Sequence, residues 1–548
     1  MGFAHEYATA VAWRGRILMP PVDFVPDWAD KPRRTKYYPG ADSFPLPACA
    51  DGPGASLGRG LGMGEPPADA PFTLDLLGGM LRDSYGLVGR RLAVQANTDL
   101  AALPSYPQAN WSRGSASGGG LYPVSIYWVC GPGGPFVPGV YYYATARHTM
   151  QRLVAGDLSA EVRAAVGDPV LTAGTDQFLV LGVKFWQNSF KYNSFSYHAV
   201  TMDVGALVQT WRMWGRSRGL SVAPILWFDE VRLSESLGLN PEEEGLFAVV
   251  PLRWTGTAGD TLGAASGAGS APPARVRRTD SERSRRVLDF ETLLRVHAVT
   301  TEHAADRPPR TALIPARAHA PREDRVLAAL PPAQAPDTSV RTALYSRRSS
   351  FGRFSAERTM TAGQLSTLLA AAASGAGFDC DVTGPGGTGI AKLYVFVNHV
   401  PGIAPGSYEY DPRRPGLRLV KPGAAGAFLQ RNYFLSNYNL EQAGVVIVPA
   451  VRTHAVLDAV GARGIRLVNA VIGAAAQAVY TASSAQGLSC GVALGFDAIS
   501  YIEELDLSET GEIPLLIMLV GYERANPADF RHDLAEPEHG GIEGGAET

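Results

Sequence analysis

Hydrophobic and polar positions along the chain predict the same series of elements twice. In each series a helix leads through a glycine-rich turn to an apolar strand, a tyrosine-containing hairpin, a second buried strand, a long helix and a last strand. The first series has helices at Leu74–Asp83 and His198–Gly215 and strands at Val124–Val129, Gln177–Val183 and Leu246–Leu252. The second has helices at Ala362–Ala373 and Leu467–Gln486 and strands at Lys392–Val397, Gly444–Val451 and Leu515–Gly521.

The residues themselves also repeat between the two series. Residues 203–239 match residues 471–507 at a constant offset of 268, so that Gly205 falls on Gly473. A period this long indicates duplicated domains, because the repeats of a solenoid run about 20–50 residues. The mixture of strands and helices predicts the α+β fold class. Small residues on the long helices would let the two copies bury these helices against each other.

Composition marks the boundaries between the expected domains. Residues 255–285 contain almost no large apolar side chain, which predicts a disordered stretch, and Val287–Val299 follows as a short amphipathic helix. Together the patterns predict a first domain at 51–254, a connector with one docked helix at 255–340 and a second domain at 341–548, with residues 1–50 preceding the repeated units.

Charge and cysteine content exclude several classes of protein. The 548 residues carry a formal net charge of -3, which offers no electrostatic footprint for nucleic acid or an anionic membrane. No basic and apolar signal opens the chain, and apolar runs such as Leu515–Val520 are too short to span a bilayer. A cytoplasmic protein without disulfides is expected, because the four cysteines are scattered: Cys49, Cys130, Cys380 and Cys490.

The second domain opens with a cluster of arginines and serines that includes Arg347, Arg348 and Ser349. Guanidinium forks and hydroxyl groups are suited to binding a phosphate. A solvated basic loop is the alternative interpretation. The first copy has Gly58–Gly62 near the corresponding place and lacks the serines and most of the arginines.

In the first copy the segment Trp111–Pro123 is rich in glycine and runs directly into a strand. Glycines there would let the backbone approach a flat ligand, and Ser115 and Ser117 could donate to its edge. A tight turn is the alternative interpretation. The chain has no G-x-G-x-x-G or P-loop motif in the required context, no spacing typical of a metal site and no G-x-S-x-G elbow of a hydrolase.

These motifs together resemble the FMN-dependent nitroreductase superfamily. More narrowly, the chain resembles the SagB-type dehydrogenases, which oxidise azolines to azoles in ribosomal peptides, and Pro26–Pro32 and Lys36–Pro39 are similar to the N-terminal region of that subfamily. The resemblance implies two tandem nitroreductase-like domains that form a pseudo-dimer within one chain. It also implies FMN as the cofactor at the interface between the halves.

The resemblance further implies which residues surround the flavin. For the phosphate and ribityl chain these are Arg347, Arg348 and Ser349, with Arg524 as a further phosphate contact. For the isoalloxazine ring they are Ser115, Ser117 and Gly118 from across the interface. Backbone N–H groups of Val492–Gly495, which include those of Leu494 and Gly495, would also lie near the ring.

The reciprocal site is expected to be degraded. Leu226-Trp227 stands where the second half has Leu494-Gly495, and the second half has 385–391 in place of the serine- and glycine-rich turn. Because these losses are complementary, we expect one composite FMN site per chain. Phe351 departs from the family's arginine-serine pattern.

Lys191 and Tyr192 are the catalytic candidates, since the azoline dehydrogenases carry a Lys-Tyr pair that is important for activity. Either side chain could take the ring proton while hydride leaves for the flavin. An exposed lysine beside a packed tyrosine is the alternative interpretation. Nearby aromatic residues could line a substrate trough or belong to the core: Phe185, Trp186, Phe190, Phe195 and Tyr197.

The function implied by the resemblance is oxidation of thiazolines or oxazolines in a precursor peptide. The expected partners are the azoline-containing peptide, a cyclodehydratase, and dioxygen as electron acceptor, with no nucleic acid and no membrane. Two other functions stay open: an NAD(P)H-dependent nitro- or quinone reductase, and a flavin-less scaffold subunit. Residues 1–50 contain no recognisable leader-peptide-binding domain.

Overall fold

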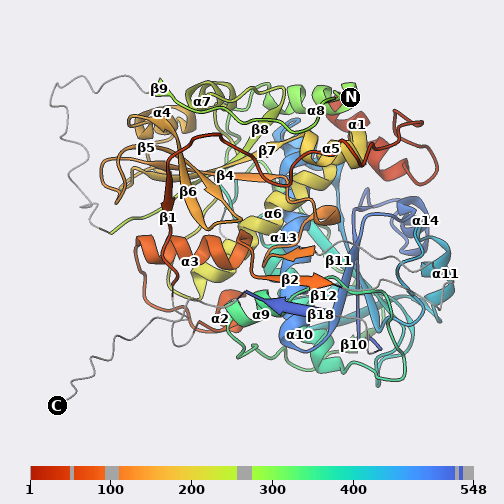
Figure 1. The fold of residues 1–548 in the computed structure, drawn as a ribbon. Coiled ribbons are helices and arrows are strands. Elements are labelled where there is room, and N and C mark those ends of the chain that lie inside the picture. Colours follow the sequence, from red (N-terminus) through yellow and green to blue (C-terminus); the bar gives the residue numbers. More distant parts are fainter. Residues whose placement is uncertain are drawn as a thin grey trace, which may run out of the picture.

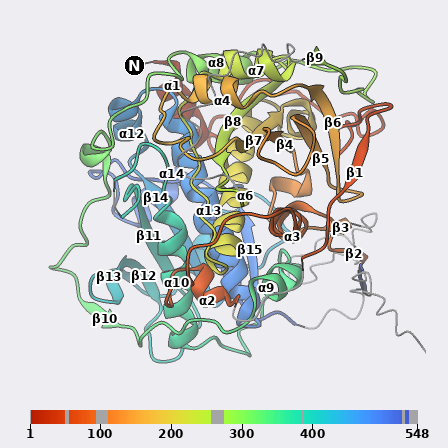
Figure 2. The same cartoon turned by 90° about the vertical axis from the view of Figure 1, so that its left-hand side faces the viewer.

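Two sheets with the same strand order form the framework of the protein (Figures 1 and 2). The computed structural model describes residues 2–49, 55–92, 110–255, 275–384, 386–524 and 530–534. The first sheet has the order β1-β6-β5-β4-β7-β8 and the second β10-β13-β12-β11-β14-β17-β15. The run β6-β5-β4-β7-β8 therefore recurs as β13-β12-β11-β14-β17. The α+β fold class and the tandem duplication are confirmed.

The strands of both sheets coincide closely with the apolar runs of the sequence. The first sheet contains β1 (Ser43–Pro45), β4 (Val124–Cys130), β5 (Gly139–Ala144), β6 (Thr149–Ala155), β7 (Gln177–Lys184), β8 (Glu244–Pro251) and, beside β6, β9 (Arg275–Val276). The second contains β10 (Leu327–Ala329), β11 (Ala391–Val397), β12 (Gly406–Asp411), β13 (Gly416–Pro422), β14 (Val445–Val451), β15 (Ser489–Ala493), β17 (Ile517–Gly521) and, beside β14, β16 (Ile513–Pro514). A small third sheet joins β2 (Gly89–Leu92), β3 (Asn110–Ser112) and β18 (Phe530–Asp533). Every residue of β4, β7 and β14 is buried, so both faces of each main sheet are covered.

The helices also recur between the halves. The described helices are α1 (Phe3–Trp13), α2 (Leu57–Gly60), α3 (Leu74–Tyr85), α4 (Ser159–Val166), α5 (Trp186–Tyr192), α6 (Ser196–Arg216), α7 (Glu230–Leu237), α8 (Glu291–Thr301), α9 (Val340–Ser346), α10 (Ala362–Ala376), α11 (Gly426–Arg431), α12 (Thr453–Val460), α13 (Gly464–Ala485) and α14 (Ala498–Glu504). Short 3-10 helices lie at η2 (Gly118–Gly120), η3 (Asn193–Phe195) and η4 (Ile314–Ala316). Threonine caps fix the starts of α3 and α10: Thr73 accepts from Leu76 N, and Thr361 forms a capping box with Gln364.

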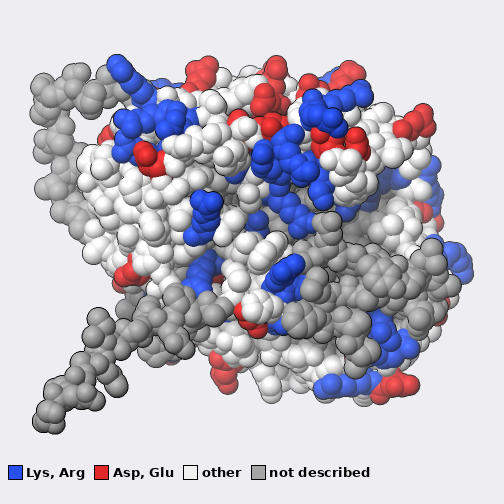
Figure 3. All heavy atoms as spheres, in the orientation of Figure 1, with Lys and Arg blue, Asp and Glu red and all other residues white. Residues whose placement is uncertain are grey.

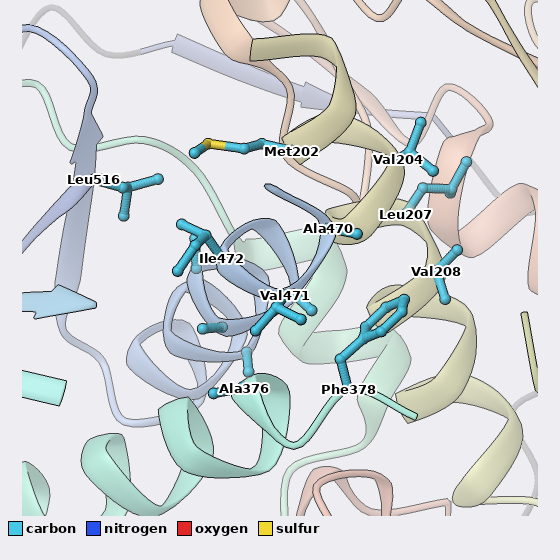
Figure 4. Packing of buried hydrophobic residues seen from close by; sticks show 14 of the residues in the cluster. Met202, Val204, Leu207, Val208, Ala376, Phe378, Ala470, Val471, Ile472 and Leu516 are labelled. Atoms are coloured by element: carbon cyan, nitrogen blue, oxygen red, sulfur yellow. The ribbon is translucent and has the colours of Figure 1, made fainter. Parts of the chain in front are cut away.

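Helices α6 and α13 pack against each other at the centre of the molecule (Figures 1 and 4). A Cβ atom on Gly205 would lie 2.0 Å from the carbonyl oxygen of Ala470, and one on Gly473 would lie 2.0 Å from that of Met202. Gly205 and Gly473 are equivalent in the repeat, and so are Met202 and Ala470. The contact is therefore the same patch meeting itself, as in a two-fold symmetric dimer.

The two central helices run in the same direction. Asn469 donates a hydrogen bond from Nδ2 to Thr201 Oγ1 over 2.7 Å, and these two residues also occupy one repeat position. Helix α13 is long and apolar enough to cross a membrane by length and composition, but its apolar window is entirely buried inside the protein. It serves here as the core helix that joins the two halves.

The chain segments outside the two copies wrap across both of them. Helix α1 packs against α8, α12 and α14, and β1 extends the first sheet at its edge. The predicted connector helix is present as α8, and the described part of the connector also supplies β9, β10 and η4. Most of the stretch predicted to be disordered, 256–274, lies outside the described residues.

Candidate functional site

A cavity of about 660 Å³ lies between the two halves, within the usual size range of ligand pockets. The first half contributes wall residues from the glycine turn and from α6: Ala116, Ser117, Gly118, Gly119, Gly120, Ala199, Met202, Asp203 and Ala206. The second half contributes residues from α13 and the segments beside it: Arg347, Arg348, Ser349, Gly473, Ala476, Gln477, Tyr480, Val492, Ala493, Leu494 and Gly495. The predicted residues from the two halves therefore meet in one cavity.

The charge of the cavity wall is predominantly positive. Arg14, Arg34 and Arg91 line it in addition to Arg347 and Arg348, whereas Asp203 is the one acidic residue among the described residues of the wall. Lys and Arg side chains also gather near the middle of the face shown in Figure 3, with Asp and Glu mostly toward its rim. The cavity is electrostatically suited to an anionic ligand.

Side chains of the second half hold the glycine turn of the first. Arg347 donates from Nε to Gly114 O over 2.8 Å and from Nη2 to Arg113 O over 2.9 Å. Gln477 accepts from Ala116 N over 2.9 Å and donates to Gly114 O over 3.2 Å. Much of the donor capacity of Arg347 is thus used to position the turn across the interface.

Asp203 on α6 anchors the same turn from the other side. Ser117 Oγ donates to one carboxylate oxygen over 2.6 Å, and Gly118 N donates to the other over 2.8 Å. Burial raises the pKa of Asp203 to about 7, although both hydrogen bonds act in the opposite direction. The carboxyl group therefore titrates near neutral pH in the wall of the cavity.

The Lys191-Tyr192 pair packs directly on this turn. A Cβ atom on Gly119 would lie 2.4 Å from Tyr192 Oη and 2.8 Å from Lys191 Nζ. Gly119 has a φ of 64°, a backbone conformation that also favours glycine. Tyr192 lines the cavity, and Lys191 Nζ lies 4.7 Å from the centre of the Tyr192 ring. Both polar groups therefore pack on the cavity's glycine turn, at a position whose backbone conformation favours glycine.

Arg348 and Ser349 lie on the wall opposite the glycine turn. Arg348 donates from Nη2 to Glu523 Oε2 over 2.7 Å, and Ser349 Oγ lies 3.0 Å from Tyr480 Oη. Glu523 also accepts from Phe351 N over 2.6 Å and from Ser489 Oγ over 2.8 Å. Burial would raise the pKa of Glu523, but the charge of Arg348 and these hydrogen bonds hold it below its usual value. Arg348 is thereby oriented by a fixed carboxylate.

The segment that follows β15 offers unused backbone donors. Leu494 and Gly495 line the cavity, and their N–H groups donate to no other described residue. Val492 N, by contrast, donates to Tyr480 Oη over 3.1 Å. Two adjacent N–H groups without a protein partner form a ready contact for a ligand acceptor atom.

Four groups of predicted residues lie outside the cavity wall. Lys191 is the first, because Tyr192 lines the cavity and Lys191 does not. Ser115 is fully buried and its N–H donates to Ser84 O over 2.7 Å, so it supports the turn from behind. Arg524 is absent from the wall, and its backbone N donates to Arg353 O. Among the five aromatic candidates Phe195 lines the cavity, while the others pack in the core: Phe185, Trp186, Phe190 and Tyr197.

Sequence reasoning missed several wall residues. Asp203 and Gln477 lie on long, mostly apolar helices. A polar residue on such a helix is a signal that could have identified them as candidate wall residues. Val471 occupies the position equivalent to Asp203 in the repeat, and this difference between the two copies was a second signal for Asp203. Arg14 carried no comparable signal, because it lies outside the repeated units.

The reciprocal position is filled by the protein itself. Leu226 N and Trp227 N, which correspond to Leu494 and Gly495, donate to the carboxylate of Asp381 over 2.8 and 3.1 Å. Arg307 of the connector donates to the same carboxylate over 2.9 Å. Phe378 is fully buried beside α6 and α13 (Figure 4). Pro385, at the start of the segment expected to replace the glycine turn, lies outside the described residues.

The composite cavity fits the cofactor that the family resemblance implies. Arg348 and Ser349 would hold a phosphate, and the N–H groups of Leu494 and Gly495 would donate to an acceptor on a flat ring. In the described part of the chain no group of His, Cys, Asp and Glu is arranged to hold a metal ion.

Comparison with known proteins agrees with this architecture. Residues 344–522 match the Nitroreductase family, so the second half contains a nitroreductase family domain. A solved nitroreductase-type structure from Anabaena variabilis superposes with a TM-score of 0.70 at 20% identity and covers 96% of this chain and 100% of its own. A Ralstonia eutropha nitroreductase-type structure has a TM-score of 0.29 at 21% identity, covering 38% of this chain and 98% of its own. A chain of the Escherichia coli microcin synthetase complex has a TM-score of 0.28 at 16% identity, covering 32% and 68%. No curated protein matches the sequence.

Proposed function

We propose that the protein is an FMN-dependent dehydrogenase that oxidises thiazolines or oxazolines to azoles in a ribosomally synthesised peptide. The nitroreductase domain indicates an oxidoreductase. The finer assignment rests on one observation: the polar groups of Lys191 and Tyr192 pack against Gly119 at the cavity that also presents Arg348 and Ser349.

In this proposal, different residues of the cavity bind the cofactor and act on the substrate. Arg348 and Ser349 bind the phosphate of the cofactor, and the N–H groups of Leu494 and Gly495 orient its ring. FMN, when bound, accepts the hydride that leaves the azoline ring. Lys191 and Tyr192 pack on the glycine turn, and in this proposal one of them takes the ring proton of a substrate bound beside that turn.

The chemistry of the substrate suggests the partner enzyme and the electron acceptor. An azoline in a peptide is formed by cyclodehydration, so a cyclodehydratase is the enzyme that supplies the substrate. Dioxygen is the proposed acceptor that regenerates the oxidised flavin. We place these steps in the cytoplasm, where the precursor peptide is made.

Lys191→Met tests the assignment of the base. The FMN-loaded variant is incubated with a thiazoline-containing model peptide, and mass spectrometry follows the loss of two hydrogen atoms. Turnover should fall by about 10²–10⁴-fold, the usual contribution of a general base, while the flavin absorbance spectrum stays unchanged. Lys421→Met, which removes a lysine paired with Glu504 on the surface of the second half, is the matched control.

Each other outcome identifies a different function. Full azoline oxidation by Lys191→Met would exclude Lys191 as the base. Oxidation of NADPH with a nitroaromatic acceptor, without azoline oxidation, would make the protein a nitro- or quinone reductase. A colourless wild-type protein that cannot be reconstituted with FMN would indicate a flavin-less scaffold subunit.

A further inference from the structure

Arg14 presents to the composite cavity a guanidinium group that pairs with no carboxylate of the described residues. It follows α1 directly and lines the cavity wall beside Phe195, with its guanidinium carbon 3.7 Å from the centre of that ring. Its Nη2 atom is buried and has no hydrogen-bond partner among the described residues. The stack on Phe195 covers one face of the guanidinium, and no hydrogen bond joins Nε or Nη1 to another described residue.

Neighbouring arginines show the arrangement that Arg14 lacks. Arg16, two residues later, donates to the carboxylate of Asp497 over 3.1 Å and to Ser500 over 3.3 Å. The buried Arg463 and Arg466 share the carboxylate of Glu230, each over 2.8 Å. A buried charge is normally paired in this way, because removing it from water alone is costly.

Among the described wall residues, no acid is left to pair with Arg14. Asp203, the one acidic residue of that part of the wall, already accepts hydrogen bonds from Ser117 and Gly118. Burial lowers the pKa of Arg14 to about 10, and no carboxylate is among the groups that oppose this shift. The guanidinium is still charged at neutral pH, so it is available to an anionic ligand in the cavity.

Arg14 lies at the opposite end of the cavity from the expected phosphate site. Helices α6 and α13 run in the same direction, and Phe195 directly precedes α6, whereas Tyr480, the neighbour of Ser349, belongs to the later part of α13. In Figures 1 and 2, α1, which leads into Arg14, lies near the top of the molecule, and α9, which leads into Arg347, lies in its lower half. Tyr192 lies at the same end as Arg14.

We propose that Arg14 forms a second anion site, which binds a carboxylate of the substrate and so places the reacting ring beside Lys191 and Tyr192. The carboxylate is an acidic side chain or the C-terminus of the peptide. A planar guanidinium with a free edge is suited to bidentate binding of such a group. The identity of the substrate rests on the proposed function, whereas the anion site itself stands on the geometry of Arg14.

Benzoate tests this site, with benzamide as its uncharged counterpart. Each is titrated into the FMN-loaded protein, and binding is followed by the change in flavin absorbance and by calorimetry. Arg14→Gln should weaken benzoate binding at least tenfold and leave benzamide binding unchanged. Arg16→Gln removes a neighbouring arginine that is already paired, and should leave both affinities unchanged. Equal benzoate affinity in wild type and Arg14→Gln would overturn the proposal.

Thermal unfolding separates a ligand-binding role from a structural one. Without ligand, Arg14→Met should melt at the same temperature as wild type or higher, because it removes a partly buried charge that pairs with no described carboxylate. A marked fall in melting temperature, with benzoate affinity retained by Arg14→Gln, would make Arg14 a structural residue.

Two further results separate this proposal from the proposed function. Benzoate binding that depends on Arg14, without any azoline oxidation, would keep the anion site and remove the dehydrogenase. Loss of NADPH affinity in Arg14→Gln, with benzoate affinity unchanged, would assign Arg14 to a dinucleotide phosphate and overturn the carboxylate assignment.

Discussion

The carboxyl group of Asp203 controls the glycine turn through hydrogen bonds to Ser117 and Gly118. Gly119 of this glycine turn also contacts the side chains of Lys191 and Tyr192. A single buried acid therefore orients the proposed catalytic pair without facing it directly. Because the pKa of this acid lies near 7, its protonation also affects stability in the physiological range.

Asp203→Asn should change how stability depends on pH. The pKa of Asp203 is raised from 3.8 to about 7 on folding, so the native state retains a proton that the unfolded state releases. Its contribution is fully present below pH 3.8 and is lost as the pH rises to about 7. Relative to the asparagine variant, wild type should lose about 1.4 kcal/mol of unfolding free energy per pH unit in this window. Urea denaturation at pH 5 and pH 7 measures the difference.

Exposed Asp69 provides the control for this experiment. Asp69→Asn should give a stability curve parallel to that of wild type, because this side chain is 89% exposed. Parallel curves for Asp203→Asn and wild type would contradict the raised pKa.

Residue types and spacing located much of the candidate site but not the direction of each side chain. Ser117 and Gly118 line the cavity as expected, whereas Ser115, two positions earlier, points into the core. Arg347 lines the cavity, yet its fork binds backbone carbonyls of the other half. Such details depend on contacts between segments more than 200 positions apart, which local pattern does not contain.

The close crossing of α6 and α13 is the element-level feature that unites the halves. Each helix places a glycine against a backbone carbonyl of the other. Close backbone approach of this kind leaves no room for a side chain, because protein interiors are closely packed. The stability of the pseudo-dimer should therefore depend on these two positions.

Gly205→Ala should destabilise the protein by about 1–3 kcal/mol, as overpacking of a tight core does. The added methyl group would lie 2.0 Å from Ala470 O, so the helices must move apart. Gly363→Ala, in the first turn of α10 with its nearest neighbour atom at 3.8 Å, should instead be neutral or stabilising. Chemical denaturation of both variants tests this, and equal effects would argue against a tight crossing.

The long elements were predictable from sequence because their patterns are strong. The predicted helices at Leu74–Asp83 and Ala362–Ala373 begin at the residues where α3 and α10 begin. Strands β1, β9 and β10 were not predicted, since each has only two or three residues and is defined by a distant partner. Short edge strands carry little periodic signal of their own.

At the scale of the whole molecule, the two halves are alike in fold and different in chemistry. One interface region opens into a cavity lined by Arg348 and Ser349, while the equivalent region is closed by Asp381, Arg307 and Phe378. The fold alone would permit two ligand sites. In the described part of the chain, the side chains leave one of these two regions open as a cavity.

The flavin content of the purified protein should therefore be about one FMN per chain, the stoichiometry of a single shared site. Flavin released by denaturation is measured against protein concentration. Arg348→Ala should lower FMN affinity by roughly 10–100-fold, the scale of a lost charge-assisted hydrogen bond. Asp381→Ala, the control in the closed region, should leave flavin content unchanged. Two flavins per chain would show that the second region opens to ligand.

Fusion of the two halves has a consequence for how this protein can evolve. In a dimer of identical subunits every substitution appears at both symmetric positions, so a change that improves one region is imposed on the other. Here Asp203 and Val471 occupy equivalent positions of the repeat, and so do Trp227 and Gly495. The residues of each pair are free to differ. The covalent connection thus releases one copy from the chemical constraints of the other, and allows a symmetric framework to carry an asymmetric division of labour.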